Sequence, residues 1–303
     1  MNLLLVLLGF SISPADSARA LISIRHIPEA AVYYSQMAAA EDGAWMLEFG
    51  RILEASGRFA DAYRVYGIAL GNSTSRETSD WLINRRQGVS PVDTTVVITA
   101  SVTNTGDITA WGIQVIIPMP VSHPPFQSLT ILENDFVPSG GLLTADIPFI
   151  TPGQTVDFSI TINIFQQPGS SRPISESISD ETLTWITETI RSMPIPEALP
   201  GPCFPMSKEM ARLAEEQGLT MKVEGGLILD RTGCIFHAWN VLAEHGLRID
   251  PLLFKEDSLL AIAHNPADVI PLWNLGLTDG YELNVLYKNP HWQLQGSMHA
   301  EAR

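Results

Sequence analysis

A thiol, an imidazole and a carboxylate follow one another in the second half of this 303-residue chain: Cys203, His237 and Asp250, separated by 34 and 13 residues. A nucleophile, a base and a carboxylate that orients the base form the general arrangement for covalent catalysis. A lone cysteine is most often a small buried apolar residue, and a lone histidine is usually a hydrogen-bonded strand residue. Their combination in this order favours a catalytic group over a core that only binds.

The residues after Cys203 predict a helix. Pro205 suits the first helical position, because proline has no N–H to satisfy there. Apolar residues then recur at helical spacing, and Gly218 provides the C-terminal stop. Cys203 is therefore expected at the helix N-terminus, where the macrodipole favours an anion. Such a position enriches the thiolate, which is the nucleophilic form of cysteine.

His237 and Asp250 are expected on neighbouring strands. The runs 221–229 and 235–242 are rich in β-branched and apolar residues, with a turn signal between them, and a third short run covers 247–250. In an antiparallel pair the two residues share a face whenever the loop between their strands has an even number of residues. With a loop of two or four residues they are opposite or diagonal, within reach of a hydrogen bond.

This stretch resembles the catalytic core of transglutaminase-like proteins, a branch of the papain-like cysteine enzymes, over about residues 179–287. The resemblance implies that Cys203 is the nucleophile, His237 the base and Asp250 the orienting carboxylate. The chain departs from the family pattern just after the cysteine, where bulky residues replace polar or small ones. The matching positions are Gly201, Cys203, Gly218-Leu219, His237-Ala238-Trp239 and Asp250-Pro251, and the departure is Phe204-Pro205-Met206.

The resemblance implies acyl transfer on a protein or peptide substrate, with no metal or organic cofactor. Cys203 would attack a peptide bond or a side-chain amide and form a thioester. Resolution by water gives a protease, peptidase or deamidase, whereas resolution by an amine gives crosslinking; hydrolysis is the simpler outcome. The competing class is a catalytically silent surface or envelope protein that keeps the fold and binds a partner.

Composition excludes some other classes. The chain has 18 Lys and Arg against 33 Asp and Glu, a net charge of −15, which argues against nucleic acid as a partner. Two cysteines are too few for a disulfide framework. A Cys203–Cys234 bridge is possible on count, but Cys234 lies three residues before His237 and so points to the opposite face of a strand. His245 lies in a turn and is interpreted as solvated, and three further histidines have no partner at metal-ligand spacing, so no metal site is expected: His264, His291 and His299.

The N-terminal apolar run at 3–12 is too short to span a bilayer. The following Ala18-Arg19-Ala20 fits signal-peptide cleavage, although the first residues carry no Lys or Arg. Export to the periplasm or the extracellular space is the first expectation. The alternative for this run is a buried strand or helix of a longer gene product, and the alternative location is the cytoplasm.

Residues 44–70 resemble one tetratricopeptide unit, in which small residues let two helices pack closely around aromatic ones. Because no second copy follows, we expect a helical hairpin rather than a binding solenoid. The polar residues 73–90 suggest a linker or a short helix. The residues that carry the resemblance are Gly50, Leu53, Gly57, Phe59, Ala62, Tyr66, Ala69 and Leu70.

From 92 to 165 the period changes to short strands with turn signals, which predicts a β-sandwich. Its turns, at residues 104–107 and 151–153, resemble those of the immunoglobulin-like domain found ahead of some bacterial transglutaminase-like cores. Its acidic residues are interpreted as solvated turn and loop residues rather than a calcium site: Asp107, Asp135 and Asp146.

A helix is expected over 180–193 with Ser179 as its N-cap. A further helix is expected over 258–263 and a closing strand over 280–287, and the tail after Pro290 is expected to be loose. The chain is thus predicted to be a multidomain α+β protein. Its parts are a signal peptide (1–20), a helical region (21–88), an immunoglobulin-like β-sandwich (90–166), a linker (167–178) and a transglutaminase-like, papain-like catalytic domain (179–303).

Overall fold

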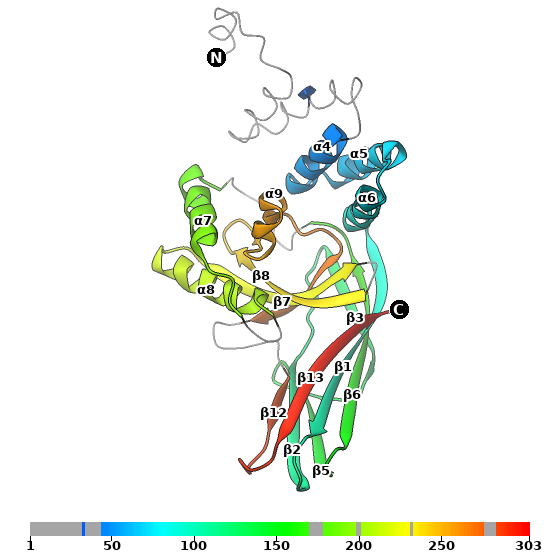
Figure 1. Cartoon of the computed structure of the whole chain (residues 1–303), viewed down its shortest axis with the longest axis vertical. Coiled ribbons are helices and arrows are strands. Elements are labelled where there is room, and N and C mark those ends of the chain that lie inside the picture. The colour runs from blue at the N-terminus through cyan, green and yellow to red at the C-terminus, as the bar shows by residue number, and fades with distance from the viewer. Residues whose placement is uncertain (1–31, 34–43, 170–177, 198–200, 231–232, 276–282) are drawn as a thin grey trace, which may run out of the picture. The chain divides into compact units, whose positions relative to one another are not determined.

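The computed structural model describes residues 32–33, 44–169, 178–197, 201–230, 233–275 and 283–303. The chain divides into two compact units, residues 1–90 and 91–303, and the described part is a mixture of helices and antiparallel sheets (Figure 1). The predicted signal peptide and most of the predicted linker lie outside the described residues. None of the helices within the described ranges is long and apolar enough to cross a membrane.

The first unit contains the predicted helical hairpin. Helices α4 (Ala44–Ala55) and α5 (Phe59–Asn72) pack against each other. A Cβ at Gly50 would lie 2.2 Å from Cε1 of Tyr66, so this crossing requires a glycine. Gly57 turns the chain between the helices with a φ of 76°, in the left-handed region that glycine adopts without strain. Both glycines were named from the sequence, and the likeness to a tetratricopeptide unit stays a prediction.

A third helix, α6 (Arg76–Gly88), occupies the segment predicted as a linker or short helix. Its N-cap is Ser75, whose side chain accepts a hydrogen bond from the Thr78 N–H. Trp81 on this helix meets the ring of Tyr66 edge-on, with centroids 5.7 Å apart. The polar sequence of α6 is therefore anchored by a cap and by a few contacts rather than by a continuous apolar face.

The second unit begins with two four-stranded antiparallel sheets whose buried faces belong to one hydrophobic cluster, as in a sandwich. Along β1, inward residues such as Val96, Ile98 and Ala100 alternate with more exposed ones, which is the pattern that predicted these strands. The sheet orders are β13-β1-β6-β3 and β12-β2-β5-β4. The strands are β1 (Val92–Asn104), β2 (Ala110–Pro118), β3 (Gln127–Asn134), β4 (Val137–Ser139), β5 (Leu142–Ile150), β6 (Thr155–Gln166), β12 (Asn284–Leu286) and β13 (Leu294–Ala302).

The prediction of a loose tail after Pro290 is wrong. Strand β13 pairs with β1 from Asn104↔Leu294 to Val96↔Ala302 (Figure 1). It lies at the edge of its sheet, and most of its side chains are exposed or half-buried. An edge strand of this kind lacks the apolar alternation that identifies a half-buried strand. The C-terminal residues thus complete the sandwich. The predicted domain boundaries had assigned these residues instead to the catalytic domain over 179–303.

A five-stranded antiparallel sheet, ordered β10-β9-β8-β7-β11, forms the rest of the second unit. Helix α8 (Cys203–Glu216) packs on β7 and β8. The helix predicted over 258–263 ends at Ala261 and continues as β10, and β11 was not predicted. The remaining elements are α7 (Asp180–Ser192), β7 (Met221–Asp230), β8 (Gly233–Leu242), β9 (Leu247–Ile249), the 3₁₀ turn η2 (Leu253–Lys255), α9 (Ser258–Ala261), β10 (Ile262–Ala263) and β11 (Val269–Leu275).

Buried glutamines join the sandwich to this sheet. Gln127 on β3 donates from Nε2 to the carbonyl of Pro271, at 2.8 Å, and Gln166 on β6 donates to the carbonyl of Val269, at 2.7 Å. Both side chains are almost fully buried. Because an unpaired buried amide is costly, these bonds tie the two sheet systems into one unit.

Candidate active site

Helix α8 begins at Cys203 itself, with Pro202 as its N-cap. The predicted start at Pro205 is two residues late: proline is tolerated throughout the first turn, so its presence does not fix which position comes first. The first N–H groups of a helix have no partner within the helix, and the macrodipole is positive at this end. Cys203 therefore sits where an anion is stabilised, and the residue is 6% exposed.

The helix ends as predicted. Gly218 has a φ of 74°, and the N–H groups of Gly218 and Leu219 bond back to the carbonyls of Glu215 and Ala214. This pair of bonds satisfies the last carbonyls of the helix. With both ends fixed, α8 holds the thiol at a defined position over the sheet.

The four-residue turn 243–246 sets the register that unites His237 and Asp250. Strand β8 pairs with β9 from Leu242↔Leu247 to Asn240↔Ile249, so Asp250 follows β9 on the diagonal from His237. His237 Nε2 lies 2.8 Å from Asp250 Oδ2. The shared face predicted from the even loop length is what the structure shows.

The charge and bonds around His237 favour its imidazolium form. Burial lowers the pKa of His237, but the negative charge of Asp250 and hydrogen bonds to Asp250 and Cys203 outweigh burial and raise it to about 9. Because Nε2 is bonded to Asp250, Nδ1 is the ring nitrogen left for the thiol. The three residues named from the sequence thus meet in the order thiol, imidazole, carboxylate.

Asp250 is held on both oxygens and is 1% exposed. Oδ1 accepts the Leu253 N–H at 3.0 Å, and Nη1 of Arg248 lies 3.5 Å from Oδ2. Burial raises the pKa of Asp250, but His237, Arg248 and the Leu253 bond together hold that pKa below its ordinary value. Sequence reasoning missed Arg248. The available signal was a cation two residues before Asp250, on the same face of the strand.

Residues on β7 and β8 pack beside the imidazole ring of His237 and hold its orientation. Trp239 stacks beside His237 with ring centroids 6.1 Å apart, and its Nε1 donates to Oε2 of the buried Glu224, at 3.1 Å. Gly226 pairs directly with His237, and a Cβ there would lie 2.0 Å from the Ile270 carbonyl oxygen. Trp239 belongs to the motif recognised in the sequence, whereas the roles of Glu224 and Gly226 depend on strand pairing and were missed.

Cys234 lies apart from this group. Both cysteines are free thiols, so the Cys203–Cys234 bridge that the count allowed is not formed here. Burial raises the pKa of Cys234, and the charges of Asp230 and Glu301 act in the same direction against a backbone hydrogen bond from Ala302. Its surroundings therefore oppose thiolate formation.

No group of three or more His, Cys, Asp or Glu side chains that could hold a metal ion occurs within the described ranges. Of the acidic residues considered for calcium, Asp135 accepts hydrogen bonds from the Ser159 N–H and hydroxyl. Asp146 accepts one from Gln114. Both carboxylates therefore have protein donors as partners.

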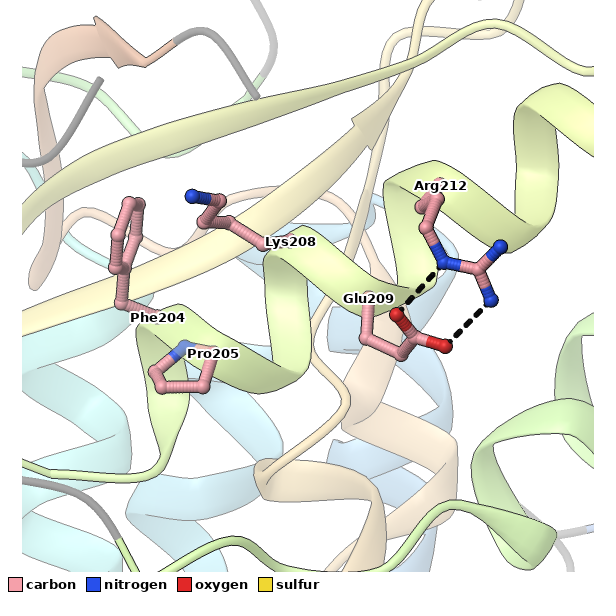
Figure 2. Close-up of a pocket in the computed structure, with 5 residues that line it drawn as sticks. All are labelled: Phe204, Pro205, Lys208, Glu209 and Arg212. Atoms are coloured by element: carbon pink, nitrogen blue, oxygen red, sulfur yellow. Dashed lines mark hydrogen bonds and ion pairs between the residues drawn. The ribbon is translucent and has the colours of Figure 1, made fainter. Parts of the chain in front are cut away.

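The outer face of α8 carries a hollow of about 520 Å³, whose lining begins at Phe204. Figure 2 shows its lining, in which Arg212 bonds Glu209 through two nitrogens. Lys208 Nζ lies 5.4 Å from the ring centre of Phe204, the residue that follows Cys203. Two of the three bulky residues after Cys203, Phe204 and Pro205, thus line an open hollow, whereas Met206 is buried. The other lining residues are Lys208, Glu209 and Arg212.

Comparisons with known proteins add one distant structural similarity to this geometry. A crystal structure of a candidate cysteine protease from Cytophaga hutchinsonii is similar over 70% of this chain and 91% of its own, with a TM-score of 0.37 and 12% sequence identity. No protein-family model matches the chain, and no curated protein matches it. The function of the site is therefore argued from the chain's own residues.

Proposed function

We propose that this chain is a transglutaminase-like cysteine enzyme that transfers acyl groups through Cys203, His237 and Asp250. Hydrolysis of a peptide or side-chain amide bond is the simplest outcome, and crosslinking to an amine is the variant. The observation that carries the proposal is the buried contact of 2.8 Å between His237 and Asp250, together with a thiol at a helix N-terminus that interacts with the same imidazole and raises its pKa. Export of the protein is part of this proposal.

In the first half-reaction the Cys203 thiolate attacks the carbonyl carbon of the substrate. Helix N–H groups at the start of α8 favour the negative charge that develops on the carbonyl oxygen. As the C–N bond breaks, the His237 imidazolium gives its proton to the leaving nitrogen. The products of this step are a thioester on Cys203 and a free amine or ammonia.

In the second half-reaction water or an amine attacks the thioester. His237, now neutral, accepts the proton of the attacking group, and the C–S bond breaks to restore the thiolate. Asp250 stays ionised throughout, because it holds the tautomer and stabilises the imidazolium. The step needs no group beyond the three side chains and the acceptor.

A catalytically silent binding protein is the second candidate, and one observation favours it: Cys203 is only 6% exposed. Such a thiol could be a packed core residue. It could not, however, form a thioester with a substrate. The two candidates therefore differ in a single measurable species.

Intact-mass analysis after incubation with an activated aryl ester of a glutamine peptide tests the proposal. The expected result is one added acyl group on the wild-type chain, removed by hydroxylamine, and none on the Cys203→Ala variant. Cys234→Ala is the matched control and is expected to acylate like wild type. Absence of a thioester on Cys203 in folded wild-type protein would contradict the proposal.

A further inference from the structure

Beside the three residues of the site lies a fourth that is buried and charged. Arg248 is 3% exposed and sits on β9, an interior strand paired with β8 on one side and β10 on the other. Its Nη2 donates to the carbonyl of Leu260 at 3.0 Å, and its Nη1 lies 3.5 Å from Asp250 Oδ2. The guanidinium is thus anchored on α9 at one nitrogen and directed at the carboxylate with another.

We propose that Arg248 is a positioning residue for acyl transfer. It holds Asp250 ionised and in place, and its charge balances the group of thiolate, imidazolium and carboxylate. This inference rests on the proposed function.

Charge counting supports it. With the thiolate and imidazolium formed, Cys203 and Asp250 contribute two negative charges, and His237 and Arg248 contribute two positive ones. Without Arg248 the same buried group would carry one uncompensated negative charge, which is costly at low exposure. The groups that act on the His237–Asp250 pair are Cys203 on α8 and Arg248 on β9, both counted above. Glu224 on β7 lies outside this count, because its carboxylate is bonded to Trp239 rather than to the pair.

Removing a cation makes every nearby group bind its proton more tightly. For Arg248→Met we therefore expect the whole pH profile of Cys203 reactivity to move toward higher pH, on its acidic and its alkaline side alike. Opposite charges at this range shift titration by roughly 1 unit or more. A residue that served only to pack β9 against α9 would lower stability and leave the profile where it was.

The experiment follows alkylation of Cys203 by iodoacetamide from pH 4 to 10, read by peptide mass, on the full chain. On the acidic side of the profile, below the pH at which wild-type Cys203 ionises, Arg248→Met is expected to react about tenfold more slowly than wild type, and Arg248→Lys is expected to restore most of the rate because it keeps the charge. If Arg248→Met folds poorly, Arg248→Gln carries the same expectation, since it also removes the charge and keeps a polar side chain on β9.

Lys255→Met is the matched structural control. Lys255 lies in the same segment and donates from Nζ to the carbonyls of Ile190, Arg191 and Met193. Its loss is expected to lower the melting temperature without moving the pH profile.

The outcomes separate the two proposals. A Cys203 that reacts like a free cysteine in wild type would overturn the proposed function together with this inference. A reactive wild-type Cys203 whose profile is unchanged in Arg248→Met would overturn the role of Arg248 alone.

Discussion

Each of the two units contains a buried carboxylate held by an arginine and a ring. In the first unit the Tyr66 hydroxyl donates to Glu54 at 2.9 Å, and Arg85 donates to both carboxylate oxygens. In the second, His237 bonds Asp250 and Arg248 lies beside it. Glu54 and Asp250 are 2% and 1% exposed. In composition and burial the two networks are nearly the same.

They differ in what the ring can do. Burial and the charge of Glu54 raise the pKa of Tyr66 far above its ordinary value, so this ring keeps its proton at any working pH. The pKa of His237 is raised to about 9, and its second nitrogen meets a thiol. A buried carboxylate–arginine pair therefore stabilises the fold by itself. It becomes a candidate for catalysis when its aromatic partner can exchange a proton near neutral pH and also contacts a nucleophilic side chain.

The largest expected effect comes from removing the Cys203 thiol, the proposed nucleophile. Cys203→Ser should reduce turnover by roughly 10⁴-fold or more, because a hydroxyl is a far weaker nucleophile than a thiolate. Cys234→Ser should keep its activity and most of its stability, because this site on β8 is only half-buried and a hydroxyl can accept the Ala302 backbone hydrogen bond. Steady-state hydrolysis of a peptide ester measures both. Activity lost with Cys234 and kept without Cys203 would overturn the site.

The second-largest expected effect distinguishes Asp250 from Glu54, the buried carboxylate of the first unit. Asp250→Asn should reduce turnover by roughly 10²–10⁴-fold, since the imidazole loses its tautomer and the stabilisation of its cation. The variant should also unfold more easily, because Arg248 loses its counter-charge. Turnover measured below the melting temperature of the variant isolates the first effect. Unchanged turnover would remove Asp250 from the mechanism.

Neutralising Glu54, the corresponding carboxylate of the first unit, should lower stability and leave the reactivity of Cys203 unchanged. Glu54→Gln leaves Arg85 without its partner and should destabilise that unit by about 3 kcal/mol. Tyr66→Phe, which removes only the hydroxyl, should cost about 1 kcal/mol. Thermal unfolding followed by circular dichroism gives the stability, and alkylation of Cys203 should be unchanged in both variants. Loss of thiol reactivity in Glu54→Gln would show that the two networks are coupled.

A smaller effect is expected from pH. The folded-state pKa of His237, about 9, lies above the unfolded value of about 6.5. Its stabilising contribution is therefore complete below about pH 6.5 and is lost as pH rises toward 9. Unfolding by urea at a series of pH values should show this decline in wild type and a weaker one in His237→Gln. Stability that rises over this window would contradict the raised pKa.

Local chemistry made much of the site predictable. The turn 243–246 fixed the register of β8 and β9, so the meeting of His237 and Asp250 followed from loop length and strand period alone. Gly218 marked the end of α8 in the same way. These features depend on residues close together in the chain.

Features that depend on contacts between different elements were missed, although the position of Arg248 two residues before Asp250 was an available signal. Arg248 acquires its role from the Leu260 carbonyl and the Asp250 carboxylate, and Glu224 from its pairing opposite Trp239. Strand β13 has little apolar alternation and is defined by pairing with β1, about 200 residues earlier in the chain. The likeness of the first two segments to tetratricopeptide and immunoglobulin-like domains stays a prediction.

Alkylation of the two cysteines in one sample tests the central claim most directly. Wild-type protein is treated with limiting iodoacetamide at pH 6, and the labelled peptides are quantified by mass. An activated thiolate at Cys203 should be modified at least about tenfold faster than Cys234, whose pKa is raised by burial. Equal rates, or faster labelling of Cys234, would contradict the account.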